Sequence, residues 1–258
     1  MNQKINNQLM LVLSVSLALS ACNSGDKKEE PKSTDSTKTE TVVQPTAPDA
    51  SMEAATVAPA LYKVLNDSLG IRISEATYKP GDSSAMHHHP DYALYVIEGG
   101  TAQFIGKDGT KADNEMKTGM ENIRPGEFHS VKNVGKTTVK ALLVEVNRPA
   151  QTMTPDAAMD ATKVAPKEYK AKNDTLGIRI VEASYKPGES SVLHSHPDCA
   201  VYVISGGTAQ FTAKDGTKMT NEMKTGMTMI SPADTHSVKN VGKTTMKVLL
   251  VEVNRARN

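Results

Sequence analysis

The histidines of this chain fall in a pattern that suits metal binding. Six of the seven form two matching groups, each with a His-x-His pair and a third histidine further along: His87, His89 and His129, and then His194, His196 and His236. Side chains alternate between the two faces of a β-strand, so each pair places two imidazoles on one face. Imidazole is a ligand for Zn, Fe, Ni and Cu. We therefore predict one divalent transition metal per group (Fe, Mn, Ni, Cu or Zn), with the third histidine supplied by another strand.

An aspartate follows each His-x-His pair, after a proline. Asp91 and Asp198 have the same strand parity as the histidines, which would let them join the metal site as ligands or as hydrogen-bond partners of the ligands. The preceding prolines interrupt a regular strand, which favours turn or edge positions instead. Both interpretations stay open at this stage.

Three further residues lie near the histidines in the sequence. His88 has Ser195 in its place in the second group, and it is expected to point away from the metal. Cys199 is expected to be a small buried residue, with a reactive thiol as the alternative. Arg124 offers the first group an anchor for an anion, since arginine pairs well with carboxylates, whereas the second group has Ser231 there.

The two histidine groups belong to two copies of one sequence. Residues 62–148 align without a gap with residues 169–255, and about seven in ten positions are identical. Each copy has the size of an ordinary domain. We predict two domains, at residues 47–149 and 154–256.

Short strands separated by glycine and proline turns fill each copy. Residues 71–76 alternate between apolar and mostly polar, and residues 138–146 form a longer apolar strand. Residues 107–110 indicate a tight hairpin turn. Such a pattern predicts an all-β sandwich or barrel. The only helix expected is brief, at residues 49–55 and again at residues 156–162.

The N-terminal region predicts export and lipid anchoring. Lys4 precedes a short apolar run at residues 9–21, which is too short to span a bilayer comfortably. The run ends in Leu-Ser-Ala-Cys, which resembles a bacterial lipobox. We therefore expect a lipoprotein signal peptide at residues 1–21, with lipid attached to Cys22. Residues 22–46 are polar and charged, which predicts a disordered tether.

Lipid on Cys22 would attach the protein to a membrane of the bacterial cell envelope. Asn23 resembles the outer-membrane sorting pattern of enteric lipoproteins, and the periplasmic and surface faces both stay open. The chain has only 2 cysteines, so lipidation leaves Cys199 without an intramolecular partner and no disulfide is expected. The net charge of +1, the lack of Trp and only 3 Phe argue against nucleic-acid binding.

Both copies resemble the cupin family, whose members are double-sheet jelly rolls with a metal in the barrel. The family's first motif, G-x5-H-x-H with a later glycine, matches from Gly81 and again from Gly188. A form of its second motif, G-x5-P-x3-H-x3-N, matches from Gly119 and from Gly226. The resemblance implies a bicupin, with two tandem barrels of the double-stranded β-helix type. The sequence around the histidines is also similar to that of small cupins related to β-alanine degradation proteins.

The chain departs from the family at one ligand. The family's usual glutamate is missing, and Ala93 and Ala200, or Tyr92 and Cys199, fall near its place. Three-histidine cupin sites include Fe(II) thiol and diketone dioxygenases. The resemblance therefore implies a metal-dependent oxygenase acting on a small organic molecule. The alternative is a metal- or small-ligand-binding module without turnover, and enzyme status stays open. The chain is expected as a monomeric pseudo-dimer or as a homo-oligomer.

Overall fold

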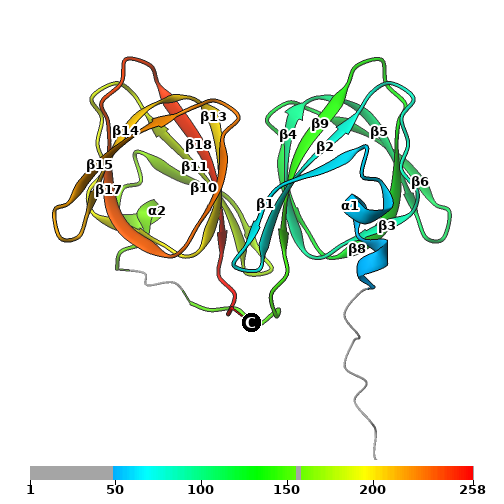
Figure 1. Ribbon diagram of the computed structural model, residues 1–258, viewed down its shortest axis with the longest axis horizontal. Helices are drawn as coiled ribbons and strands as arrows, with labels where there is room; N and C mark the ends of the chain where they lie inside the picture. Colours follow the sequence, from blue (N-terminus) through cyan, green and yellow to red (C-terminus); the bar gives the residue numbers. More distant parts are fainter. Residues whose placement is uncertain (1–48, 155–157, 258) are drawn as a thin grey trace, which may run out of the picture. The chain divides into compact units, whose positions relative to one another are not determined.

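The computed structural model describes residues 49–154 and 158–257, which contain two β-barrels, one from each repeat (Figure 1). The predicted signal peptide and the whole predicted tether, with Cys22, lie outside the described residues. Among the described residues, no helix has the length and apolar character needed to cross a membrane. The prediction of an all-β chain with one barrel per repeat is confirmed.

The first barrel has two antiparallel sheets around an apolar interior. The five-stranded sheet has the order β1-β2-β9-β4-β7, and the four-stranded sheet has the order β3-β8-β5-β6. The elements, in chain order, are η1 (Ala50–Met52), α1 (Ala54–Val57), β1 (Tyr62–Ser68), β2 (Ile71–Tyr78), β3 (His87–His89), β4 (Tyr92–Glu98), β5 (Gly100–Gly106), β6 (Lys111–Met116), β7 (Glu121–Arg124), β8 (Glu127–Asn133) and β9 (Val139–Val146).

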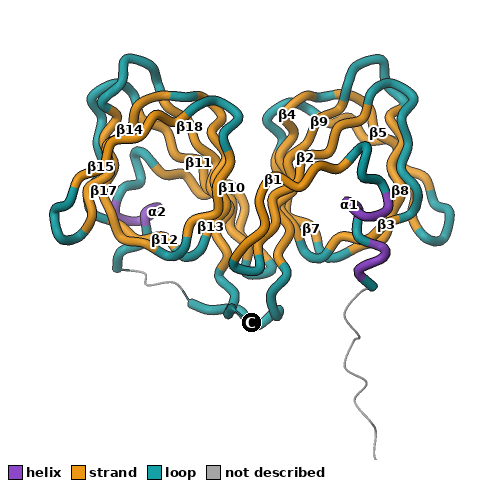
Figure 2. The backbone as a smooth tube through the Cα atoms, viewed as in Figure 1, coloured by secondary structure: helices purple, strands orange, loops and turns teal. Residues whose placement is uncertain are grey.

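The second barrel repeats this arrangement strand for strand, with the orders β10-β11-β18-β13-β16 and β12-β17-β14-β15. Strands dominate both barrels, and the helical turns are short (Figure 2). The elements are α2 (Ala161–Val164), β10 (Tyr169–Thr175), β11 (Ile178–Tyr185), β12 (His194–His196), β13 (Cys199–Ser205), β14 (Gly207–Ala213), β15 (Lys218–Met223), β16 (Thr228–Ser231), β17 (Asp234–Asn240) and β18 (Met246–Val253).

Strand β9 is apolar almost throughout because both of its faces are buried. Ala141 and Leu143 face the interior of the first barrel. Leu142, Val144 and Val146 belong to a separate cluster, to which the five-stranded sheets of both repeats contribute. A strand buried on both faces has a continuous apolar sequence instead of an alternating one. The same holds for β18 in the second repeat.

Two strands in each repeat show no sustained alternation of apolar and polar residues in the sequence, and both lie at sheet edges. In the first barrel these are β1 and β6, whose side chains are mostly exposed. An exposed edge strand needs no apolar alternation, so periodicity does not reveal it. The predicted hairpin turn between β5 and β6 is present, with Gly109 at a φ of 79° and Asp108 accepting a hydrogen bond from Thr110 N at 3.0 Å.

The predicted helices are shorter than expected and begin later. In the first repeat, the turn η1 precedes the single-turn helix α1. In the second repeat, α2 begins at Ala161, and residues 156 and 157 of that prediction lie outside the described part. Asp160 caps α2 by accepting a hydrogen bond from Thr162 N at 2.9 Å.

Candidate metal centres

The first histidine group lies on two neighbouring strands of the four-stranded sheet. Strand β3 carries His87 and His89, and β8 carries His129 directly opposite His87. The ring centroids are 4.9, 4.8 and 5.1 Å apart, and all three residues are buried. One ligand atom from each histidine lies within 4.8 Å of the others. The structure thus brings together the three histidines that the sequence grouped.

The second barrel builds the same triad from the equivalent strands. His194 and His196 lie on β12, and His236 on β17 pairs with His194. The ring centroids are 4.9, 5.0 and 5.5 Å apart. The ligand atoms again lie within 4.8 Å of one another. Each barrel therefore has its own triad, and no histidine is shared between the repeats.

An oxygen atom faces the Nδ1 atom of the first two histidines in each triad. His87 Nδ1 lies 2.8 Å from the carbonyl oxygen of Ala85, and His89 Nδ1 lies 2.7 Å from Glu145 Oε1. The second barrel repeats these contacts at 2.8 and 2.7 Å, from His194 to Val192 and from His196 to Glu252. Carbonyl and carboxylate oxygens only accept, so the proton of each imidazole lies on Nδ1. The Nε2 lone pair is then free to bind a metal.

The third histidine of each triad has a carboxylate on its own strand. His236 Nδ1 lies 3.0 Å from Asp234 Oδ2, within hydrogen-bond distance. His129 Nδ1 lies 3.4 Å from Glu127 Oε1, an ion-pair distance without hydrogen-bond geometry. The two carboxylates occupy equivalent positions two residues before the histidine.

The Nε2 atoms are the strongest sign that a ligand belongs at the centre of each triad. Those of His89, His194 and His196 are buried and have no hydrogen-bond partner among the described residues. Buried polar atoms without a partner are rare and costly. A metal ion would satisfy them, and three neutral imidazoles suit a divalent transition metal. The donor set therefore fits one metal per barrel.

Burial favours the neutral form of four of the six imidazoles by lowering their pKa. It lowers the pKa of His87 to about 3 and that of His194 to about 4. It also lowers the pKa of His129 and of His236, although a neighbouring carboxylate opposes the effect in each case. Neutral imidazole is the form that binds metal, so protons compete little with a metal at neutral pH.

The sequence prediction missed the two carboxylates that hold His89 and His196. Glu145 on β9 is 5% exposed, and Glu252 on β18 is 0% exposed. Each interrupts an apolar Leu-Leu-Val-Glu-Val run. A carboxylate inside a strand that is buried on both faces needs a specific partner. A glutamate within an apolar run is therefore the sequence signal by which these two residues can be found.

The two buried glutamates differ in their cationic partners. Arg179 donates to Glu252 Oε2 from Nε at 2.6 Å, and its Nη2 lies 2.6 Å from the same oxygen. In the first barrel, Arg72 binds Glu53 and another carboxylate, and its Nη1 lies 3.9 Å from Glu145 Oε2. The negative charge on Glu145 is therefore less neutralised by a cation than that on Glu252. It interacts more strongly with His89 than the charge on Glu252 does with His196.

Arg124 is already paired within its own barrel. Its Nε and Nη2 donate to the two oxygens of Glu127 at 2.8 and 3.0 Å, and Tyr92 OH donates to Glu127 Oε1 at 2.7 Å. Burial raises the pKa of Glu127, but the neighbouring His129, Arg124 and Tyr92 outweigh this effect and hold the pKa well below its usual range. The expected anion anchor is thus bound to an anion of the protein itself.

Asp91 and Asp198 lie outside both triads and contact the other repeat instead. Arg148 Nη2 donates to Asp198 Oδ2 at 2.6 Å, and Arg255 Nη2 donates to Asp91 Oδ2 at 2.5 Å. Each aspartate also accepts a hydrogen bond from a backbone N–H in a turn of its own repeat, at 2.8 and 2.7 Å. These contacts turn both carboxylates away from the histidines, so the structure supports the turn interpretation and not the ligand interpretation.

A cavity adjoins each triad, and the two cavities differ in size and lining. The volume is about 230 Å³ in the first barrel and about 100 Å³ in the second. Three substituted positions on one wall contribute to the polar difference: Tyr92, Asn122 and Arg124 in the first barrel, and Cys199, Met229 and Ser231 in the second. The first cavity is therefore larger and has more hydrogen-bonding groups beside its triad.

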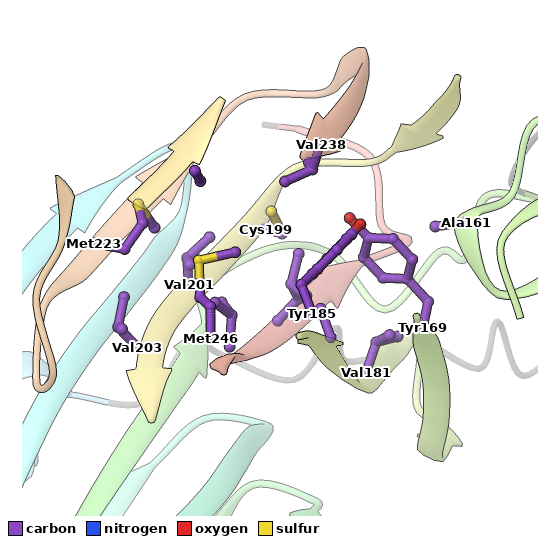
Figure 3. Close-up of a cluster of buried hydrophobic side chains, with 14 of the residues drawn as sticks. Ala161, Tyr169, Val181, Tyr185, Cys199, Val201, Val203, Met223, Val238 and Met246 are labelled. Atoms are coloured by element: carbon purple, nitrogen blue, oxygen red, sulfur yellow. The ribbon is translucent and has the colours of Figure 1, made fainter. Parts of the chain in front are cut away.

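Cys199 and His88 are buried away from solvent. Cys199 is a free thiol in the apolar interior of the second barrel, together with Tyr169, Tyr185 and Met246 (Figure 3). Burial raises the pKa of its thiol well above the usual range, which disfavours the reactive thiolate. His88 packs against an aromatic ring at a centroid distance of 4.5 Å and takes no part in the triad.

Comparisons with known proteins agree with this architecture. A family model described as a cupin domain matches residues 181–252, and no curated protein matches the chain. The Bacillus subtilis oxalate decarboxylase, a protein with Mn(II) centres, has a TM-score of 0.52 and 16% identity over 76% of this chain and 73% of that chain. AerE from Microcystis aeruginosa has a TM-score of 0.54 and 11% identity over 74% of this chain and 91% of that chain.

A third solved structure, the Lactobacillus farciminis oxalate decarboxylase in complex with formate, has a TM-score of 0.50. It is 15% identical over 73% of this chain and 78% of that chain. At such identities the likeness establishes the fold. The family match lies in the second repeat, and the first repeat is a close copy of it. Residues 181–252 are therefore similar to a cupin domain, and the chain has a fold of two tandem barrels like that of these structures.

Proposed function

We propose that this protein binds one divalent transition metal in each barrel and that the first barrel uses its metal to act on a small organic molecule. The observation that carries the proposal is the pair of buried triads, in which the Nδ1 atoms of His89, His194 and His196 face oxygen acceptors while their Nε2 atoms lack partners. A fold shared with a protein that has Mn(II) centres supports a redox-active metal such as Mn or Fe.

The residues of the first barrel suit this role. A metal with three protein ligands keeps positions open for water or substrate and can polarise what binds there. Glu145 orients His89, and the cavity of about 230 Å³ gives a small molecule room beside the triad. Asn122 and Arg124 on the cavity wall supply polar groups for orienting it. By analogy with three-histidine cupins, the reaction class is an oxygenation.

Metal analysis of protein purified without an affinity tag tests the proposal. We expect about two metals per chain at saturation, because each repeat keeps a complete triad. His89→Ala and His196→Ala should each remove about one metal and leave the fold intact. Oxygen consumption by the Fe- or Mn-loaded protein with candidate substrates supports the enzyme. If neither variant changes the metal content, these histidines are not ligands and the proposal fails.

The second barrel favours the alternative function, a metal-binding module without turnover. Its cavity is only about 100 Å³ and is lined mainly by apolar side chains such as Met229 and Met246. A Zn site without an exchangeable water would support this role for the second barrel. Retention of full activity in His196→Ala would assign turnover to the first barrel alone.

We also propose that Cys22 carries a lipid that attaches the protein to the bacterial envelope, on the outer membrane. The support is the lipobox-like sequence Leu-Ser-Ala-Cys after a short apolar run. Cys22→Ser should leave the precursor uncleaved and unlabelled by radioactive palmitate. Continued labelling of that variant would contradict the assignment.

A further inference from the structure

Tyr62 forms a hydrogen bond with the nitrogen through which His87 would bind a metal. Its hydroxyl oxygen lies 3.1 Å from His87 Nε2. His87 Nδ1 faces the carbonyl oxygen of Ala85 at 2.8 Å, which only accepts, so Nδ1 carries the proton and Nε2 is the acceptor. Tyr62 therefore donates its hydroxyl proton to the lone pair with which His87 would bind a metal.

A second tyrosine supports this arrangement. Tyr78 OH donates to Tyr62 OH at 2.9 Å, so the two hydroxyls and His87 form one directed chain. Tyr62 and Tyr78 are 5% and 3% exposed, and both line the cavity beside the triad. Hydrogen bonds in such a chain polarise and strengthen one another in a buried site.

The second barrel has the same tyrosines without the same hydrogen bonds. The ring of Tyr169 lies near that of His194, with centroids 4.7 Å apart. Yet His194 Nε2 and Tyr185 OH have no hydrogen-bond partner among the described residues. The residue paired with Tyr185 across the sheet is Met246, where the first barrel has a valine opposite its own tyrosine. The two triads thus differ at this lone pair.

We propose that Tyr62 is a positioning residue whose hydroxyl occupies the lone pair of His87 Nε2 in the metal-free protein. A metal that enters the first barrel must therefore break the Tyr62–His87 hydrogen bond. The metal in the second barrel breaks no such bond. The inference rests on the proposed function, since it presumes that both triads bind metal. Tyr62 thereby lowers the metal affinity of the first barrel.

Removing the Tyr62 hydroxyl should tighten metal binding in the first barrel. A neutral intramolecular hydrogen bond is worth roughly 0.5–1.5 kcal/mol, which corresponds to a change in affinity of about two- to thirteenfold. To isolate the first barrel, Tyr62→Phe is made together with His236→Ala, which disables the second triad. Zn(II) affinity is measured by competition with a chromophoric chelator and compared with that of His236→Ala alone.

The second barrel supplies the matched control. Tyr169→Phe is made together with His129→Ala and is compared with His129→Ala alone. No increase in Zn(II) affinity is expected, because His194 Nε2 has no hydrogen bond from this tyrosine to lose. An unchanged or weakened affinity in Tyr62→Phe overturns the inference, and so does an equal increase in both barrels. If the single-barrel proteins bind no Zn(II), the proposed function itself fails.

A spectroscopic measurement on the unmutated protein tests the same hydrogen bond directly. Hydrogen bonding to an unprotonated imidazole nitrogen lowers its ¹⁵N chemical shift. In metal-free protein, His87 Nε2 should therefore resonate below His194 Nε2. Equal shifts for the two nitrogens would show that the Tyr62 hydrogen bond is absent. This measurement needs no variant, so it does not depend on whether Tyr62→Phe folds.

Discussion

The histidines of the candidate sites are oriented by atoms of three kinds. A backbone carbonyl faces His87 Nδ1, a buried glutamate on another sheet faces His89 Nδ1, and a carboxylate on the same strand lies beside His129. Contacts to the nitrogen remote from the metal determine the tautomer and the ring orientation of a ligand histidine. The geometry of the triad therefore depends on residues that never touch the metal, above all on Glu145 and Glu252.

Replacing these glutamates should weaken metal binding. Glu145→Gln keeps the size of the side chain but removes the charge that supports His89, so we expect the metal affinity of the first barrel to fall about tenfold or more. Glu252→Gln should do the same in the second barrel. Chelator competition measures the loss. Glu98→Gln, at a side chain that is 55% exposed, is the control and should change nothing. Equal affinities for Glu145→Gln and the control would contradict the role of Glu145.

The metal-free protein should lose stability in mild acid. Burial lowers the pKa of His87 to about 3 and of His194 to about 4, below the 6.5 of a free imidazole. Between the pKa of the folded chain and that of a free imidazole, the unfolded chain binds more protons than the folded chain. The free energy of unfolding therefore decreases as pH falls from about 6.5 toward about 4. Above pH 6.5 these groups have no such effect.

Urea unfolding of the metal-free protein at pH 7.5 and pH 5 measures this dependence. A variant with His87→Gln and His194→Gln has no imidazole to protonate at these positions and should show a shallower decrease. A decrease of equal size in both proteins would assign the acid sensitivity to other groups.

At the scale of elements, the sites depend on two short strands and the strands beside them. The three-residue strand β3 places His87 opposite His129, and the long strand β9 brings Glu145 from the other sheet to His89. Both sheets must therefore be in correct register for the triad to form. Close backbone approaches at the strand ends help to define that register.

Gly99, between β4 and β5, marks one of these approaches. A Cβ at this position would lie 2.4 Å from the carbonyl oxygen of Met116 and 2.9 Å from Thr118 N, which are backbone atoms that cannot turn aside. We expect Gly99→Ala to lower the free energy of unfolding by about 2–3 kcal/mol, measured by urea unfolding.

The matched control for this change is Gly106→Ala. A Cβ there meets only the end of the Asp108 side chain, at 2.9 Å, and the second repeat has Ala213 at the equivalent position. Its effect should stay within about 0.5 kcal/mol. If the two variants are equally stable, the backbone at Gly99 is able to relax and the argument is wrong.

At the scale of the whole molecule, the two repeats contact each other through equivalent residues. Arg148 Nη1 donates to the carbonyl oxygen of Arg255 at 3.0 Å, and Arg255 Nη1 donates to that of Arg148 at 3.5 Å. Each arginine also pairs with an aspartate of the opposite repeat, Asp198 or Asp91. Such reciprocity is typical of a two-fold related dimer, here within one chain.

Asp198→Asn should destabilise the protein without removing a metal. The side chains of Asp198 and Arg148 are 6% and 2% exposed, so the change leaves a buried guanidinium without its counter-charge, at a cost of about 3 kcal/mol. Asp91→Asn should cost less, because the Asp91 side chain is 24% exposed and water can replace the lost charge. Urea unfolding and metal analysis of both variants test this. Loss of a metal in either would restore the aspartate as a ligand.

The sequence by itself determined the fold class, the duplication and the three histidines of each site. These features are local or periodic: strand parity places His87 and His89 on one face, and the repeat shows that the second site is a copy of the first. Turn residues such as Gly109 are equally local, because a positive φ favours glycine wherever it occurs.

Only the tertiary structure decided what each site residue contacts. Glu145 reaches His89, and Tyr62 reaches His87, from strands far away in the sequence or on the other sheet. Asp91 shares strand parity with the histidines, yet it turns away because an arginine of the other repeat binds it. Such contacts depend on how the sheets face each other and on which repeat lies nearby, and neither has a periodic signature in the chain.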